Sequence, residues 1–530
     1  MYIHDSGQLG FPNFLLPFEG QLDPQNPWLV LSRLIPWEEF EGHYASRFSS
    51  SQGAPAKSFR MALGALIAKE RLGCSDEALV QQVLENPYLQ CFLGLESFTT
   101  KAPFEASLLS HFRQRLGEKL VGAVNESVIR KLRADSLGED VASDAPPASC
   151  RSESEGEADP DTAEGEQEQL QLRREGRLVV DATCAPADIP YPTDTKLLNT
   201  AREQSESLID ELHKSRHGNS PKPRTQRRKL RRQWLEFIKL KKPSTKRIRK
   251  FKRMLLGSLQ RNLGHLEALL DEVGLERLDC HHYKMLLVIK EVYRQQKQMF
   301  DLRSKRTDHR IVNLFQPHIR PLVRGKAGAN TEFGAKLSAS VENGYFVLHH
   351  TSFENFNEST HLIEQVQAYK KRSGCWPESV HADRIYRTQA NRKWCLERGI
   401  RLSGPRLGRP PKDETLRKEQ KRQQAQDERD RNIIEGKFGQ AKRRFSLKRI
   451  MARLADTSRP VIALIFLIIN LEKGLRLLFF TLFPAGAVMR FWGLAHAQRF
   501  QNPTGVFFLR AGSAERMSLV ASQAVLLQPA

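Results

Sequence analysis

Residues 332–351 read EFGAKLSASVENGYFVLHHT, and apolar side chains alternate with small or polar residues from Phe333 to Val341. That alternation gives an extended strand one apolar face and one polar face. Asn343-Gly344 is a dipeptide favoured in two-residue turns, and a second strand-like run follows it. The stretch therefore predicts a β-hairpin, which places a sheet in a chain whose other long segments have helical periodicity.

Two aspartates follow apolar, strand-like runs on either side of this hairpin in the sequence. GRLVVDAT leads to Asp181, and ESVHAD leads to Asp383. Helical patterns follow the hairpin and follow Asp383, the second of them in QANRKWCLERG. The order of strand, helical segment, hairpin, helix, strand and helix predicts an α/β core with a mixed sheet flanked by helices.

Residues 429–445, RDRNIIEGKFGQAKRRF, place Arg431, Glu435 and Lys442 on one helical stripe. Steps of four and seven residues, at about 100° each, return the side chains to nearly the same face. An ordinary surface ion pair explains this spacing when it is taken alone. The stripe gains meaning because Glu435 follows Asp181 and Asp383 in the chain and adds a third acid to them.

Charge points to a polyanionic partner. The 530 residues carry 83 Lys and Arg against 61 Asp and Glu, a net charge of +22, which favours nucleic acid over an anionic membrane. Residues 214–253 hold eighteen Lys or Arg residues and one acid within a helical pattern, and they belong to a predicted basic helical insertion at about 195–305. Trp234 and Phe237 in this block either stack on nucleobases or anchor the core of the protein, and their helical spacing favours the core. The residues expected to bind DNA phosphates here are Arg227, Arg228, Lys229, Arg231, Arg232, Lys246, Arg247, Arg249 and Lys250.

The rest of the chain divides by composition. Residues 1–135 have helical periodicity and predict an all-α domain, whose basic second half fits either DNA binding or a solvated helix face. Residues 136–172 are predicted to be an acidic disordered linker, residues 173–480 the α/β domain, and residues 481–530 a tail without an assigned role. The apolar run 461–483 is interrupted by Glu472 and Lys473, which favours a buried helix over a membrane span. Seven scattered cysteines form no C-x-x-C pair and fit a reducing cytoplasm, and Cys280-His281-His282 has no second pair at zinc-site spacing.

Taken together, several segments resemble a DDE transposase of a bacterial insertion sequence, over roughly residues 30–475. They are VVDATCAPADIPYPTD, VRGKAGANTEFGAKLS, ESVHADRIYRTQANRKWC, RLSGPRLGRPPKD and RDRNIIEGKFGQAKRRF. The resemblance implies a ribonuclease H-like core in which Asp181 and Asp383 lie on neighbouring strands and Glu435 lies on a following helix. It also implies that these acids bind two divalent ions, Mg²⁺ with Mn²⁺ as a substitute, and that Arg431 and Lys442 contact DNA phosphates.

The chain departs from the related motifs at two places. Glu428 stands where a tyrosine is usual. In the related motif, the residue after the second acid is often followed by a glycine and an aromatic residue, whereas here Arg384 is followed by Ile385 and Tyr386. Neither change removes a metal ligand. Asp188 and Asp194 compete with Asp181 as the first acid, but only Asp181 ends a strongly apolar, strand-like run. His381 either assists proton transfer or packs beside the site, and packing is favoured.

These observations predict a transposase that binds the terminal inverted repeats of its insertion sequence, cleaves DNA in a metal-dependent reaction and transfers the strand to target DNA. Because two ends are processed together, the resemblance implies a homodimer or larger assembly on DNA, in the bacterial cytoplasm and at the nucleoid, with no membrane partner. One alternative is a ribonuclease H-like nuclease without strand transfer. The other is a catalytically inert, transposase-derived DNA-binding protein.

Overall fold

The computed structural model describes residues 15–16, 20–49, 55–140, 174–214, 221–323, 331–405 and 413–482. The chain forms two compact units, Met1–Leu475 and Arg476–Ala530. Most of the predicted linker, 136–172, and most of the tail, 481–530, fall outside the described residues. Helix α6 nevertheless continues to Asp140, so helical structure extends past the residue where the linker was predicted to begin.

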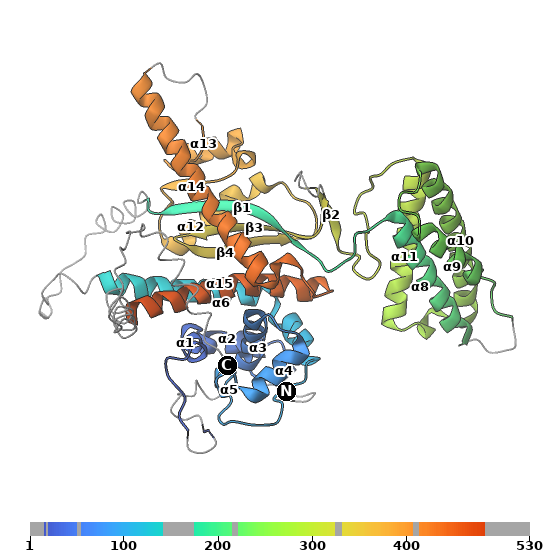
Figure 1. Cartoon of the computed structure of the whole chain (residues 1–530), viewed down its shortest axis with the longest axis horizontal. Helices are drawn as coiled ribbons and strands as arrows, with labels where there is room; N and C mark the ends of the chain where they lie inside the picture. Colours follow the sequence, from blue (N-terminus) through green and yellow to red (C-terminus); the bar gives the residue numbers. More distant parts are fainter. Residues whose placement is uncertain are drawn as a thin grey trace, which may run out of the picture. The chain divides into compact units, whose positions relative to one another are not determined.

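A mixed sheet forms the centre of the first unit (Figure 1). The strand order is β2-β3-β1-β5-β6, and β4 also pairs with β3. Strand β1 runs antiparallel to β3 and parallel to β5, and β5 runs parallel to β6. The α/β core is therefore confirmed, with β1 in its middle. The strands are β1 Arg177–Pro186, β2 Arg320–Val323, β3 Thr331–Glu342, β4 Tyr345–Ser352, β5 Ser379–His381 and β6 Arg401–Leu402.

The predicted hairpin is confirmed as β3 and β4. Asn343 and Gly344 both have positive φ, 51° and 80°, as a turn of type I′ requires. Strand β1 is longer than its apolar run suggested. Asp181 was expected to close the strand, but it lies near the middle, because the backbone ladder to β3 continues as far as Pro186 opposite Gly334. Backbone pairing does not depend on the polarity of a side chain that points away from the core.

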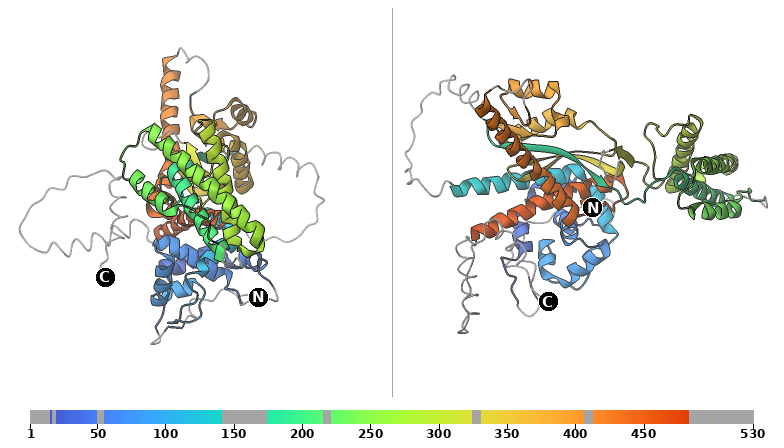
Figure 2. Two further views of the ribbon diagram at one scale, coloured as in Figure 1. Left: turned by 90° about the vertical axis from the view of Figure 1, so that its right-hand side faces the viewer. Right: turned by 45° about the horizontal axis from the view of Figure 1, so that its top comes forward.

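Helices cover the sheet on both faces. Leu178, Val180 and Val380 point to one face and pack with α12 Leu362–Ser373 and α13 Gln389–Glu397. Helix α14 Glu414–Arg444 crosses the other face, where it contacts β1 (Figure 1, Figure 2). Short 3-10 turns connect these elements at η4 Glu358–His361, η5 Arg384–Tyr386 and η6 Ser446–Lys448.

The N-terminal part is helical, as its periodicity predicted. Gly73 ends α3 in the left-handed conformation, and the Ser75 side chain caps α4. Gly117 interrupts α6 with φ 64°. The helices are α1 Pro27–Leu34, α2 Trp37–Ala45, α3 Phe59–Leu72, α4 Asp76–Glu85, α5 Pro87–Phe92 and α6 Leu108–Asp140.

Helix α15 Ala455–Leu482 joins the N-terminal helices to the sheet. The Asn470 side chain on α15 accepts a hydrogen bond from the Phe346 backbone N–H and donates to the Phe346 carbonyl, both at 2.8 Å, and it also donates to the Asn125 side chain of α6 at 2.8 Å. Residues 461–471 of this helix are buried, as predicted for its apolar run. In the part of the chain that the structure describes, no helix has the length and apolarity needed to cross a membrane.

The insertion is a bundle of helices with its own apolar core (Figure 1). Trp234 and Phe237 pack against this core, and the Phe237 ring stacks on Phe251 with centroids 4.2 Å apart. The expectation that these aromatic residues are core anchors is confirmed. The elements are α8 Asp194–Lys214, α9 Arg227–Ile238, α10 Thr245–Val273, η3 Leu275–Arg277 and α11 Cys280–Asp301.

Candidate active site

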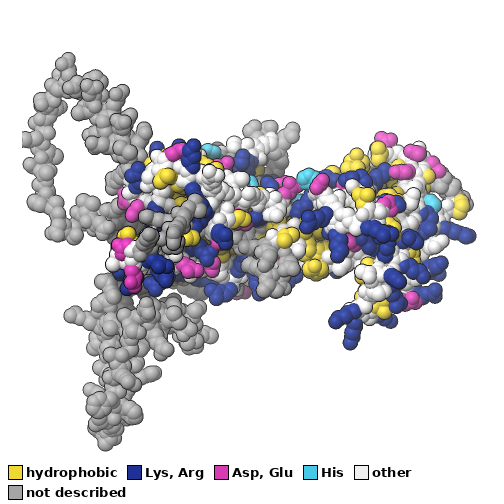
Figure 3. Space-filling model, turned by 90° about the horizontal axis from the view of Figure 1, so that it is seen from above, with side chains coloured by type: hydrophobic (Ala, Val, Ile, Leu, Met, Phe, Trp, Pro, Cys, Tyr) yellow, Lys and Arg dark blue, Asp and Glu magenta, His cyan; other side chains and the backbone are white. Residues whose placement is uncertain are grey.

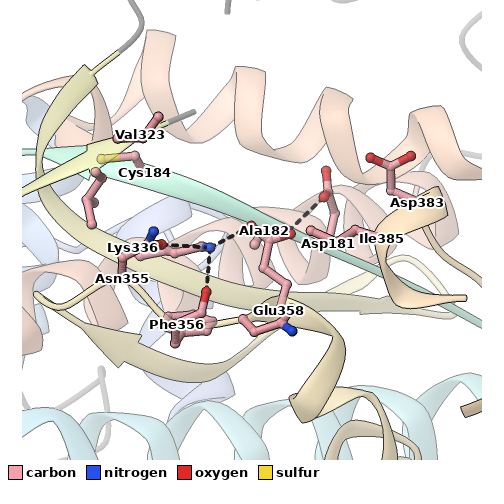
Figure 4. A pocket seen from close by; sticks show the side chains of 12 residues that line it. Asp181, Ala182, Cys184, Val323, Lys336, Asn355, Phe356, Glu358, Asp383 and Ile385 are labelled. Atoms are coloured by element: carbon pink, nitrogen blue, oxygen red, sulfur yellow. Dashed lines mark hydrogen bonds and ion pairs between the residues drawn. The ribbon is translucent and has the colours of Figure 1, made fainter. Parts of the chain in front are cut away.

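Pairing of β1 with β5 brings the first two acids together. The strands are parallel, with Val179 opposite His381. Two residues further along each chain are Asp181 and Asp383, so the register sets these residues side by side on the same face. Both acids line one cavity of about 540 Å³ (Figure 4). Two acids separated by some two hundred residues of sequence therefore face the same space.

Each aspartate is oriented by a backbone N–H. An Asp181 carboxylate oxygen accepts from the Ala182 N–H at 2.8 Å, and Asp383 accepts from the Arg384 N–H at 2.7 Å as the cap of η5. The Asp383 side chain remains 55% exposed. A carboxylate that is held in place and still open to solvent is suited to receive a cation.

Helix α14 brings the third acid next to the second. The Arg431 guanidinium lies 3.5 Å from an Asp383 oxygen and 4.0 Å from a Glu435 oxygen. One cation therefore contacts two of the three acids. The predicted ion pair within the stripe is present, and it includes a carboxylate from the sheet.

The far end of the stripe contacts β1. Lys442 Nζ donates to Thr183 Oγ1 at 3.0 Å. Thr183 is two residues after Asp181 on the same strand face. Arg431 and Lys442 were expected to contact DNA phosphates. In the structure Arg431 contacts Asp383 itself, and Lys442 contacts Thr183, two residues after Asp181.

Two aspartates that the sequence reasoning missed fasten α14 to the sheet. Asp427 accepts from Arg401 Nη1 at 2.9 Å through both carboxylate oxygens and from the Gly404 N–H at 3.3 Å. Asp430 accepts from Arg177 Nη1 at 2.8 Å. Burial opposes ionisation of Asp427, but the hydrogen bonds from Arg401 and Gln423 outweigh it and lower the pKa of this carboxyl. In a helix with so many charges, nothing local marks these two as the buried ones.

His381 is fully buried next to this attachment. Its Nε2 lies 2.9 Å from the Ser379 hydroxyl and its Nδ1 lies 3.8 Å from Asp427. Burial lowers the pKa of His381, with the neighbouring Asp427 charge acting in the opposite direction. Because its contacts are within the protein core and not with the cavity, the packing interpretation of His381 is favoured.

The opposite end of the cavity contains a cation and an acid that the sequence did not single out. Lys336 Nζ contacts Glu358 at 2.9 Å, the Phe356 carbonyl at 2.8 Å and the Asn355 side chain at 3.2 Å (Figure 4). In the sequence, Lys336 is only one of the polar residues of an alternating strand, and the alternation does not predict its contacts in this cavity.

Burial raises the pKa of the Tyr386 hydroxyl, and the negative charges of Glu358, Asp181 and Asp383 raise it further.

The competing aspartates have other partners. Asp188 accepts from Arg449 Nε at 2.6 Å. Asp194 contacts Lys252 at 2.8 Å and Arg310 at 2.6 Å inside the insertion, and neither aspartate lines the cavity of Asp181. The geometry favours Asp181 among the three.

The donor chemistry of the site suits hard divalent cations, which prefer carboxylate oxygens. Asp181, Asp383 and Glu435 supply such oxygens. Over the described ranges, however, no group of three or more His, Cys, Asp and Glu side chains is arranged to hold a metal ion, and this includes Cys280-His281-His282. The acids fit a divalent cation by chemistry, while Arg431 balances part of their charge.

The basic insertion separates into structural and exposed cations. Arg227 contacts Asp210 at 2.6 Å, and Arg249 lies over the Phe300 ring at 4.4 Å, so both serve the bundle. The other predicted phosphate ligands are exposed on α9 and at the start of α10, and Figure 3 shows Lys and Arg side chains gathered over the insertion. These exposed residues are Arg228, Lys229, Arg231, Arg232, Lys246, Arg247 and Lys250.

Bases in the second half of the N-terminal domain make contacts within the protein. Arg113 pairs with Asp76, Arg130 lies 3.2 Å from Glu39, and the Lys131 ammonium donates to the Arg33 carbonyl at 2.6 Å. Arg133 on α6 donates to Ser373 at 3.1 Å. These contacts hold the domain together, and the Arg133 contact attaches it to α12 of the α/β core. DNA binding by this domain stays a prediction.

Comparisons with known proteins point in one direction. Residues 380–472 match the family model "Transposase DDE domain", and residues 16–115 match "Transposase domain (DUF772)". The chain is also 27% identical over 201 residues to "Uncharacterized protein ORF8 in nfe locus" of Rhizobium meliloti, an alignment that covers 37% of this chain and 77% of that protein. No solved structure gives a significant match. Both family matches are transposase domains and the first includes Asp383 and Glu435, so over these two segments the chain is similar to DDE transposases.

Proposed function

We propose that this protein is the transposase of an insertion sequence, and that it binds the terminal inverted repeats, cuts DNA and transfers the freed 3′ strand end to target DNA. The observation that carries the proposal is the placement of Asp181 and Asp383 on one cavity by the pairing of β1 with β5, with Arg431 linking Asp383 to Glu435. We further propose that the sheet and its helices are a ribonuclease H-like catalytic core. One acid on β1, a second two residues after the end of the neighbouring strand β5, and a third on the following helix α14 support this.

Asp181, Asp383 and Glu435 would hold the divalent ions. When bound, two such ions supply an activated hydroxyl and a stabilised leaving oxyanion at a phosphodiester. The chain's own contribution is orientation: backbone N–H groups fix the two aspartates, and the Asp427 and Asp430 contacts fix the helix of Glu435. Arg431 and Lys442 place positive charge along β1, where a DNA phosphate would lie.

DNA cleavage tests the site. Duplexes made from the DNA flanking the gene should be nicked by the wild type in Mg²⁺ or Mn²⁺. Asp181→Asn, Asp383→Asn and Glu435→Gln should each lower the rate on the order of 10³-fold, about 4 kcal/mol, with DNA binding retained. Glu419→Gln is the matched control, because Glu419 is an exposed acid on the same helix. Unchanged nicking in Asp383→Asn would remove that residue from the site.

Strand transfer separates the alternatives. A pre-cleaved end with a free 3′ hydroxyl should be joined to a target plasmid by the wild type and not by Asp181→Asn. Nicking without joining would leave a nuclease. Tight DNA binding without either reaction, in several divalent metals, would leave a DNA-binding protein with an inert catalytic domain.

A further inference from the structure

Ile385 is a large aliphatic residue exposed beside a catalytic candidate. It stands two residues after Asp383, where the related motif commonly has glycine, and it is 52% exposed. Its neighbour Tyr386 is completely buried. Single exposed aliphatic residues are common on protein surfaces. This one also lines the cavity that contains Asp181 and Asp383.

The turn that presents Ile385 is held on several sides. The Tyr386 N–H donates to the Asp383 carbonyl at 3.1 Å, and the Arg387 N–H donates to the Arg384 carbonyl at 3.1 Å. Asn391 Nδ2 donates to the Tyr386 carbonyl at 2.8 Å from a buried position on α13. The buried Tyr386 ring and these hydrogen bonds fix the backbone on either side of Ile385. The backbone therefore fixes the direction in which the Ile385 side chain leaves the turn.

The cavity has two carboxylates suited to a divalent cation at one end, and apolar and polar side chains along the rest of its wall. Figure 4 shows Asp181, Asp383 and Ile385 at one end, and Lys336, Asn355 and Phe356 at the other. The wall at the second end is rigid, because Lys336 is held by three partners and lies 4.8 Å from the Phe356 ring centre. Apolar and amide side chains beside a charged centre suit a nucleoside, whose base is flat and apolar on its faces and polar on its edges.

We propose that Ile385 packs against a nucleobase next to the phosphodiester bond at Asp181 and Asp383, and that the cavity seats that nucleotide. This inference rests on the proposed function, because it requires DNA at these acids. Aliphatic side chains that enter a base step unstack it, at a cost that new contacts offset. Such unstacking moves the adjacent phosphate out of the duplex and toward the aspartates.

The test is a fluorescence measurement that does not require cleavage. Duplexes from the DNA flanking the gene carry 2-aminopurine at single positions around the nick site and bind to protein with the Asp181→Asn change, in EDTA. One position should brighten by about twofold or more on binding, as expected when a base leaves its stack. Adding Ile385→Ala should abolish the rise while weakening binding by about tenfold or less. Ile385→Met should retain it, and Ile433→Ala is the matched control, because Ile433 is 45% exposed but does not line the cavity.

The outcomes separate this inference from the proposed function. Efficient nicking by the wild type with no 2-aminopurine response at any position, or with the same response in Ile385→Ala, would overturn the role of Ile385 alone. Failure of the wild type to bind or nick these duplexes would overturn both. Loss of the response in Ile433→Ala as well as in Ile385→Ala would count against a specific contact.

Discussion

Asp181 and Asp383 illustrate what one residue contributes and what its surroundings add. Each carboxylate accepts a backbone N–H from the next residue, a local arrangement that any strand end or turn can provide. Their proximity comes from the parallel register of β1 and β5. Replacing Asp181 or Asp383 therefore tests the chemical role of that carboxylate. A shift in the register of β1 and β5 would instead separate the two carboxylates.

His349 on β4 is a residue whose titration should appear in the stability of the protein. Burial, with the Arg372 charge acting in the same direction, lowers the pKa of His349 from 6.5 to about 4. Between those pH values the unfolded chain binds more protons than the native one, so the free energy of unfolding falls as the pH drops. The slope is at most about 1.4 kcal/mol per pH unit for each such histidine.

Chemical denaturation of the wild type and of His349→Gln at pH 4.5–7 measures this slope. The variant should lose less stability on acidification than the wild type, and His281→Gln, which changes an exposed histidine, should follow the wild type. His318, whose pKa burial also lowers to about 4, contributes the same sign in all three proteins. Parallel curves for the wild type and His349→Gln would contradict the assignment.

At the scale of elements, α14 is both a carrier of functional groups and a structural support. Asp427 and Asp430 are buried, whereas Arg431 is half-buried and Glu435 is exposed. Asp427 lies one turn before Arg431 and two turns before Glu435, so these three side chains follow one another along the same side of the helix. Attachment of Asp427 to Arg401 and of Asp430 to Arg177 therefore sets where Arg431 and Glu435 lie relative to β1 and β5.

Asp427→Asn should loosen this attachment. The amide keeps the size of the side chain but loses the charge that faces Arg401, so we expect a loss of about 1–3 kcal/mol of stability. The nicking rate should fall about 10- to 100-fold, while the affinity for DNA stays nearly constant, because the helix no longer holds Glu435 in place. Glu419→Gln on the same helix is the control. A variant that loses stability but nicks at the wild-type rate would show that Asp427 has only a structural role.

At the scale of the whole molecule, the side chain of Asn470 on α15 forms hydrogen bonds to both α6 and β4 and so joins the N-terminal helices to the sheet. The Asn470 amide occupies both the N–H and the carbonyl of Phe346 on an outer strand and also contacts Asn125. Asn470→Leu should cost about 2–4 kcal/mol, because it leaves buried polar groups without partners. The stability of Asn470→Asp should lie between that of the wild type and that of Asn470→Leu, since a carboxylate can accept from the Phe346 N–H but cannot donate to the Phe346 carbonyl. Thermal or chemical unfolding measures the series, and equal stability in all three proteins would refute the junction.

Long-range charge is the second property of the whole molecule. The exposed bases of α9 should contact DNA phosphates, whereas Arg294 and Lys297 of α11 are exposed but paired with Glu291 and Asp301. Arg228→Ala with Arg231→Ala should therefore lower the salt dependence of DNA binding, the slope of log K against log salt, by about 2. Arg294→Ala with Lys297→Ala, which removes the same charge, should leave the slope unchanged. Equal effects of the two pairs would place the DNA elsewhere.

The sequence by itself determined the hairpin, the helical segments, the order of the three acids and the basic insertion. These depend on local periods, turn residues and composition, which fix the faces that each element buries. It misplaced Asp181 at the end of β1, said nothing about Asp427 or Lys336, and marked Ile385 only as a departure from related motifs, because burial and exposure within a charged helix or a turn depend on distant partners. Only the tertiary structure set Asp181 beside Asp383 and sorted the structural cations from the exposed ones, because strand register and packing join residues that are hundreds of positions apart.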